Sequence, residues 1–138
     1  MTKPAGISKL KAKLDKIFSQ FIRLRDSTDD GGLGQCCTCD KVIFYKDGDA
    51  GHFLSRTYLG TRFDERNVNL QCKSCNGFRA GEQYKHGQYV NMMHGEGVAE
   101  ELQAIAKQTH KWDRIRYEEQ IEKYTKSVKE LKASRGLE

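Results

Sequence analysis

The sequence predicts an α+β fold: a small core of short strands and one helix, with flanking N-terminal and C-terminal α-helices. Two Cys-x-x-Cys pairs, separated by a stretch with strand and turn signals, indicate the core. Apolar residues recur every three or four positions towards both ends of the chain, which is the period of an amphipathic helix. With 138 residues we expect one domain, made of a basic helix (7–25), the core (36–80) and a helical C-terminal region (86–133).

The first predicted element is the helix over residues 7–25, with Ser8 as its N-cap. The apolar positions at helical spacing are Ile7, Leu10, Leu14, Ile17, Phe18, Phe21 and Leu24. A connection with three glycines, residues 26–35, then leads to the core.

A β-hairpin is expected at the start of the core. The run Val42–Tyr45 is rich in β-branched and aromatic residues, and Ala50–Leu54 can return beside it across the turn signal Asp47-Gly48. Residues 57–65 are expected to form an irregular loop. The apolar residues at positions 68 and 70 predict one more short extended segment.

Helices are expected over the rest of the chain. One begins near Cys75 or Asn76, a short one covers residues 86–93, and another covers 98–108. Apolar residues at helical spacing in a Glu/Lys-rich context predict a long helix over 112–131, which could cross the core or pair with a second chain.

The four cysteines of the two pairs are Cys36, Cys39, Cys72 and Cys75. Two intervening residues allow both sulfurs of a pair to face one ion, and four thiolates are a ligand set of structural zinc sites. A single pair could be a redox centre, but two pairs in so short a chain predict a structural Zn²⁺. Cys37 is not expected to be a ligand, because only one residue separates it from Cys39.

The net charge of +5 is unevenly distributed. Residues 1–25 carry seven Lys or Arg and one Asp, and residues 51–85 carry six basic and three acidic residues. Such basic blocks favour a polyanion such as DNA as a partner, although the lysines of the first helix could equally solvate its surface. No apolar run approaches the roughly 20 residues of a membrane span. Clustered cysteines suit a reducing compartment, so we expect a soluble, cytoplasmic protein without a membrane partner.

Three polar residues around the cysteine pairs indicate catalysis. His52, in the motif DAGHF, lies between the two pairs; Asn67 precedes the second pair and Asn76 follows it directly. A histidine on a strand, an asparagine in the following segment and a His or Asn after the second Cys-x-x-Cys resemble the HNH (ββα-metal) endonucleases with a zinc-stapled core. The resemblance implies an HNH-like core between the flanking helices.

Further motifs narrow the resemblance. FSQFIRLRD, AGHFLSR and TRFDERNVNLQCKSCN are similar to the NinG/Rap family of lambdoid phage recombination proteins, over about residues 7–110. This resemblance implies a DNA endonuclease that acts on branched, Holliday-junction-like intermediates in the cytoplasm of the host cell. It also implies a catalytic divalent metal, Mg²⁺ or Mn²⁺, beside the structural zinc.

The resemblance also assigns roles to single residues. His52 is the general base, because an imidazole titrates near the working pH. Asn67 orients this base or braces the loop through its backbone, with Asn69 as a rival, and Asn76 supplies an oxygen ligand to the catalytic ion. The residues expected to hold DNA phosphates are Arg56, Arg62, Lys73 and Arg79, although each could instead pair with a nearby carboxylate.

One position departs from the family pattern. Many HNH motifs have a metal-binding Asp or His directly before the base, where this chain has Gly51. Asp49 is the nearest carboxylate, but an offset of three places it on the opposite face of a strand from His52 unless the strand bends. Asp64 and Glu65 compete with Asp49 for the catalytic metal.

The expected function is therefore an HNH-type endonuclease, and a homodimer would suit a two-fold junction. The alternative is a non-catalytic, zinc-binding DNA-binding module, which the glycine at position 51 supports and which would bind in a salt-sensitive way. A purely structural or partner-binding protein would leave the basic stretch 51–85 unexplained. The remaining histidines, His86, His94 and His110, have no partner at ligand spacing and receive no role.

Overall fold

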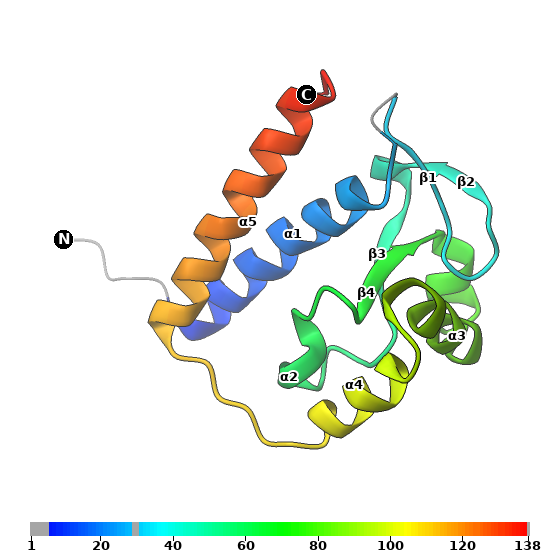
Figure 1. Cartoon of the computed structure of the whole chain (residues 1–138). Helices are drawn as coiled ribbons and strands as arrows, with labels where there is room; N and C mark the ends of the chain where they lie inside the picture. Colours follow the sequence, from blue (N-terminus) through cyan, green and yellow to red (C-terminus); the bar gives the residue numbers. More distant parts are fainter. Residues whose placement is uncertain (1–5, 29–30, 138) are drawn as a thin grey trace.

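The computed structural model describes residues 6–28 and 31–137. A pair of long helices lies beside a mixed layer of strands and short helices (Figure 1). The pair consists of α1 (Ile7–Arg25) and α5 (Arg114–Ser134), which start at the same end of the molecule and run in the same general direction. The fold is therefore a small mixed α/β domain, as the sequence predicts at this level.

α1 occupies the predicted residues, and its apolar stripe faces α5. Leu14 and Ile22 are completely buried, and the ring of Phe18 contacts the ring of Tyr124 edge-on at 4.9 Å between centroids. Spacing by four residues places these side chains on one helix face, so their burial follows directly from the sequence. The Ser8 cap prediction is wrong, because the N-cap is Gly6, two residues earlier, and no side chain caps the helix.

Two antiparallel sheets of two strands each make up the β structure. β1 (Leu33–Gln35) pairs with β2 (Val42–Phe44), and β3 (Asp49–His52) pairs with β4 (Val68–Gln71). In the second sheet Asp49 lies opposite Gln71 and His52 lies opposite Val68.

The predicted hairpin between 42–45 and 50–54 is therefore wrong. The 3₁₀ turn η1 (Tyr45–Asp47) separates the two segments, and each pairs with a strand more distant in sequence. The end of α1 holds β4 in place: Arg25 donates to the carbonyl of Val68 at 2.9 Å, and Asp26 accepts from the Leu70 amide at 2.9 Å. Long-range contacts of this kind outweigh a local turn signal.

Short helices complete the mixed layer. α2 (Leu59–Arg62) forms within the segment expected to be irregular, and η2 (Ser74–Phe78) is a five-residue π-helical turn where a helix was expected. α3 (Gln83–His94) and α4 (Val98–Ala106) pack together over Phe53 and Leu54. No helix among the described residues is long and apolar enough to span a membrane.

Candidate functional site

The four predicted cysteines converge on one point. The sulfurs of Cys36, Cys39, Cys72 and Cys75 all lie within 4.8 Å of one another, and those of Cys39 and Cys72 are 3.8 Å apart. Four sulfurs bound to one zinc ion at about 2.3 Å in a tetrahedron are about 3.8 Å apart. The cluster therefore has the size and the donor atoms that a zinc ion requires.

Two polar groups lie beside sulfurs of the cluster. The Cys75 amide donates to the Cys72 sulfur at 3.4 Å, and the Thr38 hydroxyl lies 3.4 Å from the Cys36 sulfur. Burial raises the pKa of Cys36, but hydrogen bonds from the Cys72 backbone and from Thr38 outweigh the effect of burial. The pKa of Cys36 is therefore lowered. A lowered thiol pKa favours the thiolate form that binds a metal.

The fifth cysteine, Cys37, lies outside the cluster, as predicted. Burial raises the pKa of its thiol, and the neighbouring Cys36 raises it further. Cys37 therefore stays a neutral, buried thiol.

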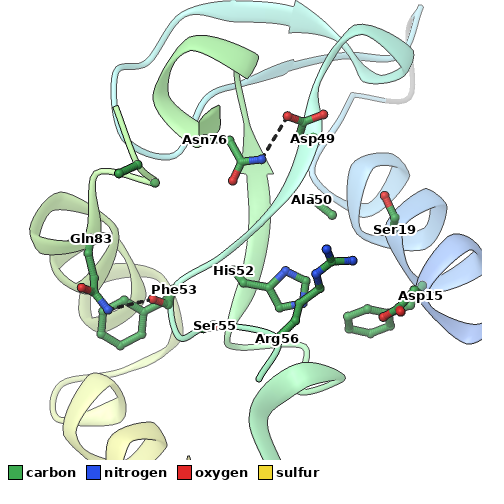
Figure 2. Close-up of a pocket in the computed structure, with 13 residues that line it drawn as sticks. Asp15, Ser19, Asp49, Ala50, His52, Phe53, Ser55, Arg56, Asn76 and Gln83 are labelled. Atoms are coloured by element: carbon green, nitrogen blue, oxygen red, sulfur yellow. Dashed lines mark hydrogen bonds between the residues drawn. The ribbon is translucent and has the colours of Figure 1, made fainter. Parts of the chain in front are cut away.

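A pocket of about 670 Å³ lies between α1 and the β3–β4 sheet. Its walls carry polar side chains from segments far apart in sequence: Asp15 and Ser19 from α1, Asp49 and His52 from β3, and Asn76 from η2. Figure 2 shows His52 and Arg56 extending towards α1, with Asp49 and Asn76 at the other end of the pocket. The pocket thus brings together three residues that the sequence assigned to catalysis or metal binding.

His52 is held by a single backbone contact. Its Nε2 lies 3.0 Å from the carbonyl oxygen of Arg62. A carbonyl oxygen only accepts, so Nε2 carries the proton and Nδ1 is the basic nitrogen of the neutral ring. Burial lowers the pKa of His52, the carbonyl of Arg62 opposes this, and the cation of Arg56 lowers it further. The ring is therefore neutral, with a free basic nitrogen, at neutral pH.

Asn67 braces the loop after His52 instead of bonding to the imidazole. Its side chain is fully buried, accepts from the Leu54 amide at 2.9 Å and donates to the carbonyls of Leu54 and Thr61 at 3.1 and 3.0 Å. These three bonds join the end of β3 to α2, which carries the Arg62 carbonyl. Of the two roles left open by the sequence, the geometry corresponds to bracing through the backbone.

The rival asparagine, Asn69, lies in a separate buried network. Its amide nitrogen lies 3.1 Å from Nε2 of His86, and its amide oxygen lies 3.0 Å from Nε2 of His94 and 3.2 Å from Arg25. Both histidines are on α3, so Asn69 attaches that helix to β4. Two histidines without a predicted role thus serve to position α3.

Asp49 and Asn76 meet at one end of the pocket. The Asn76 amide donates to Oδ2 of Asp49 at 3.0 Å (Figure 2). Lys73 forms an ion pair with Oδ1 of Asp49 at 2.8 Å. Asp49 and His52 both line the pocket despite their offset of three residues, but at opposite ends of it (Figure 2). Asp64 and Glu65, the competing carboxylates, do not line it: Asp64 pairs with Arg66, and Glu65 accepts from Tyr124.

The glycine before His52 has a structural cause. Gly51 is buried against Gln71 of β4, and a Cβ atom at this position would lie 2.1 Å from the Gln71 side-chain oxygen. Gln71 is itself held by Thr38 and by the carbonyl of Gly81. Any side chain at position 51 would therefore require Gln71 to move.

The predicted phosphate-binding residues lie in different settings. Arg62 is committed to Asp15 of α1 through two contacts, at 3.0 and 2.5 Å, and also donates to the carbonyl of Arg56. Arg56 and Arg79 are exposed, and Lys73 is exposed although it pairs with Asp49. The structure therefore leaves Arg56, Lys73 and Arg79 accessible and uses Arg62 as a brace.

Asp15 was not anticipated from the sequence. It is the single acidic residue among the seven basic residues of positions 1–25, a context in which it resembles a solvated surface charge. Its partner, Arg62, lies 47 residues away, and no local pattern connects them. The first helix is basic overall, but the charged side chain that it contributes to the pocket, beside Arg62, is its one acid.

The fold and the cysteine cluster define a small mixed α/β protein with a site that could hold a zinc ion. The family model described as bacteriophage lambda NinG protein matches residues 3–134, which is nearly the whole chain. The chain belongs to this NinG family. No curated protein and no solved structure matches it.

Proposed function

We propose that the protein is a metal-dependent DNA endonuclease of HNH type that acts on branched, Holliday-junction-like DNA during phage recombination. The observation that carries the proposal is the state of His52. Its Nε2 proton is held by the Arg62 carbonyl, so Nδ1 is a basic nitrogen in a pocket that also contains Asp49 and Asn76. A positioned neutral imidazole is the group needed to take a proton from an attacking water.

The order of the elements along the chain supports the interpretation of the core as HNH-like. His52 ends β3, Asn67 precedes β4, and Asn76 lies in the helical turn after the second cysteine pair. This order resembles the ββα order in which such cores place base, brace and metal-binding residue, with the π-helical turn η2 in the place of the helix. The cysteine cluster would hold the structural zinc and so tie the strands to the turn.

Asp49 and Asn76 would hold the catalytic ion. Oxygen donors are the ligands that Mg²⁺ and Mn²⁺ prefer, and a Mg²⁺ site needs only one or two carboxylates beside water and phosphate oxygens. The Asp49 carboxylate and the side-chain oxygen of Asn76 would fit that requirement once the Asn76 amide, whose nitrogen donates to Asp49 at 3.0 Å, turns its oxygen towards the ion. Such an ion would supply charge neutralisation at the scissile phosphate and the leaving oxygen.

The surroundings of the pocket suit a phosphate backbone. Arg56 lines the pocket and is exposed, and Lys73 and Arg79 are exposed on the segments next to Asn76. We propose these three as the phosphate contacts, with Arg62 reserved for positioning. A homodimer in the host cytoplasm, where four thiolates stay reduced, belongs to the same proposal.

The test is cleavage of a labelled four-way junction and a matched linear duplex, with Mg²⁺, Mn²⁺ or no added ion. Wild type is compared with His52→Ala, and zinc content and melting temperature are measured for both. We expect metal-dependent cutting, faster on the junction, that His52→Ala abolishes while keeping its zinc. The mass of the free and the junction-bound protein tests the dimer.

A second candidate function is a zinc-binding DNA module without catalysis. The ion pair between Lys73 and Asp49, at 2.8 Å, favours it, because Lys73 neutralises the carboxylate that a catalytic ion would need. In addition, the glycine at position 51 provides no second carboxylate for a catalytic ion. Salt-sensitive binding without cutting at any divalent ion, unchanged in His52→Ala, would establish this module and refute the enzyme.

A further inference from the structure

Phe78 is almost fully exposed beside the pocket. Its exposure is 95%, whereas Phe18, Phe53 and Phe63 are buried at 2%, 6% and 7%. It is the last residue of η2, two positions after Asn76, and the chain returns to the pocket wall at Ala80. The largest apolar side chain of this segment therefore faces solvent between two residues that line the pocket.

The backbone after Phe78 is held in an unusual conformation. Ala80, Gly81 and Glu82 all have positive φ, at 52°, 85° and 46°, although only one of them is glycine. The Gly81 amide donates to the Cys75 carbonyl at 2.8 Å, and the Gly81 carbonyl accepts from Gln71 at 2.9 Å. Backbone of this kind persists only when its surroundings hold it and is concentrated at functional sites. The turn that presents Phe78 is thus anchored to the cysteine cluster and to β4.

The charge around Phe78 favours a polyanion. Arg79 follows it directly, and two exposed lysines lie before and after the turn: Lys73, which pairs with Asp49, and Lys85. Glu82 is the one acidic residue of the segment 73–85 and contacts Lys85 at 4.0 Å. An exposed aromatic ring among cations is the combination with which proteins stack on nucleic-acid bases while binding the backbone.

We infer that Phe78 stacks on a nucleobase whose neighbour is missing or displaced, and thereby selects DNA with an interrupted base stack. This inference deepens the proposed function, on which it rests. In a continuous duplex both faces of each base pair are covered, so a ring gains little there. At a branch point or a single-stranded segment a base face is accessible, and the ring next to Asn76 would place that interruption at the pocket.

The test measures binding without cutting. The zinc-loaded full chain, without added divalent ion, is titrated into a four-way junction with 2-aminopurine at the branch point and into a continuous duplex with the same label. Phe78→Leu keeps an apolar side chain but removes the aromatic face, and Phe78→Trp keeps that face. Ile115→Ala on α5, another exposed apolar residue, is the matched control.

We expect Phe78→Leu to weaken binding to the junction about tenfold and to abolish the fluorescence change. Its binding to the duplex should be unchanged, and Phe78→Trp and Ile115→Ala should resemble wild type. Equal junction affinity and fluorescence in wild type and Phe78→Leu would overturn the inference and leave Phe78 as a contact for a protein partner. If that variant also cuts junctions normally, the nuclease stands and only the stacking role fails. A wild type that binds no DNA overturns both.

Discussion

Asp15 and Arg62 form a two-point ion pair that couples α1 to the proposed catalytic histidine. The distances are 3.0 Å from Nε to Oδ1 and 2.5 Å from Nη2 to Oδ2, and both side chains are largely buried. The carbonyl of the same Arg62 accepts the Nε2 proton of His52 at 3.0 Å. Asp15 thus acts on His52 in two ways. It holds Arg62, whose carbonyl orients the imidazole, and its negative charge raises the pKa of His52.

Asp15→Asn is expected to reduce stability and to change the pH dependence of cleavage. Loss of this pair should lower the free energy of unfolding by about 2 kcal/mol. Asp15 raises the pKa of His52 and Arg62 lowers it, so removing the carboxylate leaves an uncompensated cation. A lower pKa of His52 should move the acid limb of the cleavage profile to lower pH. It also makes His52 a weaker base, so the rate at pH 7 should be slower. Urea unfolding and rates from pH 5 to 8 measure both effects.

The matched control for Asp15→Asn is Glu119→Gln, which removes an exposed carboxylate on α5. It should match wild type in both measurements. An unchanged acid limb in Asp15→Asn would show that Asp15 has only a structural role.

Zinc removal is expected to unfold the domain. Apparent binding energies of structural zinc sites are about 10–16 kcal/mol, which is at least comparable with the net stability of a small domain. Cys39→Ser is the most informative variant for this test, because Cys39 is exposed and its replacement creates no cavity. We expect it to lose the one zinc per chain that elemental analysis should find in wild type, together with cooperative melting.

Cys37→Ser provides the control for this variant. Cys37 is buried but lies outside the cluster, so zinc stoichiometry should stay at wild-type level with only a modest loss of melting temperature. If Cys39→Ser kept its zinc and its melting curve, the structural role of the cluster would be refuted.

His86 is expected to make stability fall as the pH falls. Burial lowers the pKa of His86 to about 4, and His52 and His94 add to the effect. The unfolded chain binds this proton near pH 6.5, so between pH 6.5 and 4 protons favour unfolding. The full contribution is about 3 kcal/mol, present above the unfolded pKa and lost as the pH falls towards 4.

The measurement for His86 is urea unfolding at several pH values for wild type and His86→Gln. Thiolates also titrate in acid, so the difference between the two proteins at each pH isolates the histidine. The free energy of unfolding of wild type should fall relative to that of His86→Gln as the pH falls. A difference independent of pH would contradict the prediction.

Gly51→Ala is expected to destabilise the protein without affecting the cysteine cluster directly. The added methyl group would lie 2.1 Å from Gln71, whose amide is held by two hydrogen bonds. Overpacking of this kind costs about 1–3 kcal/mol. Gly77→Ala is the control, because a Cβ atom there meets nothing within 4 Å. Equal stability of the two variants in urea unfolding would show that Gly51 is not required by packing.

The parts of the structure with short-range signals were predictable. Apolar spacing by three and four gives α1 between residues 7 and 25, and the Cys-x-x-Cys spacing identifies the four residues that converge. The helix and each Cys-x-x-Cys depend on residues within one or two turns of each other, and the two pairs, although distant in sequence, are joined by the need of one ion for four ligands.

The strand pairing and the α1 wall of the pocket were not predictable, because distant residues determine them. Arg25 and Asp26 hold β4 by bonds that cross more than 40 residues, and β3 pairs with β4 although a turn signal pointed to its other neighbour. Asp15 becomes part of the site only because α1 packs across it. A single sequence contains no local sign of either contact.

The packing of α1 against α5 has a consequence for the timing of synthesis. α1 supplies one wall of the pocket, and the residues that bury its apolar stripe include Tyr117, Ile121 and Tyr124. These residues leave the ribosome after every residue that lines the pocket. We therefore expect a nascent chain to assemble its cysteine cluster before α1 is packed against the pocket, so that the site proposed for catalysis is complete only after α5 has been made.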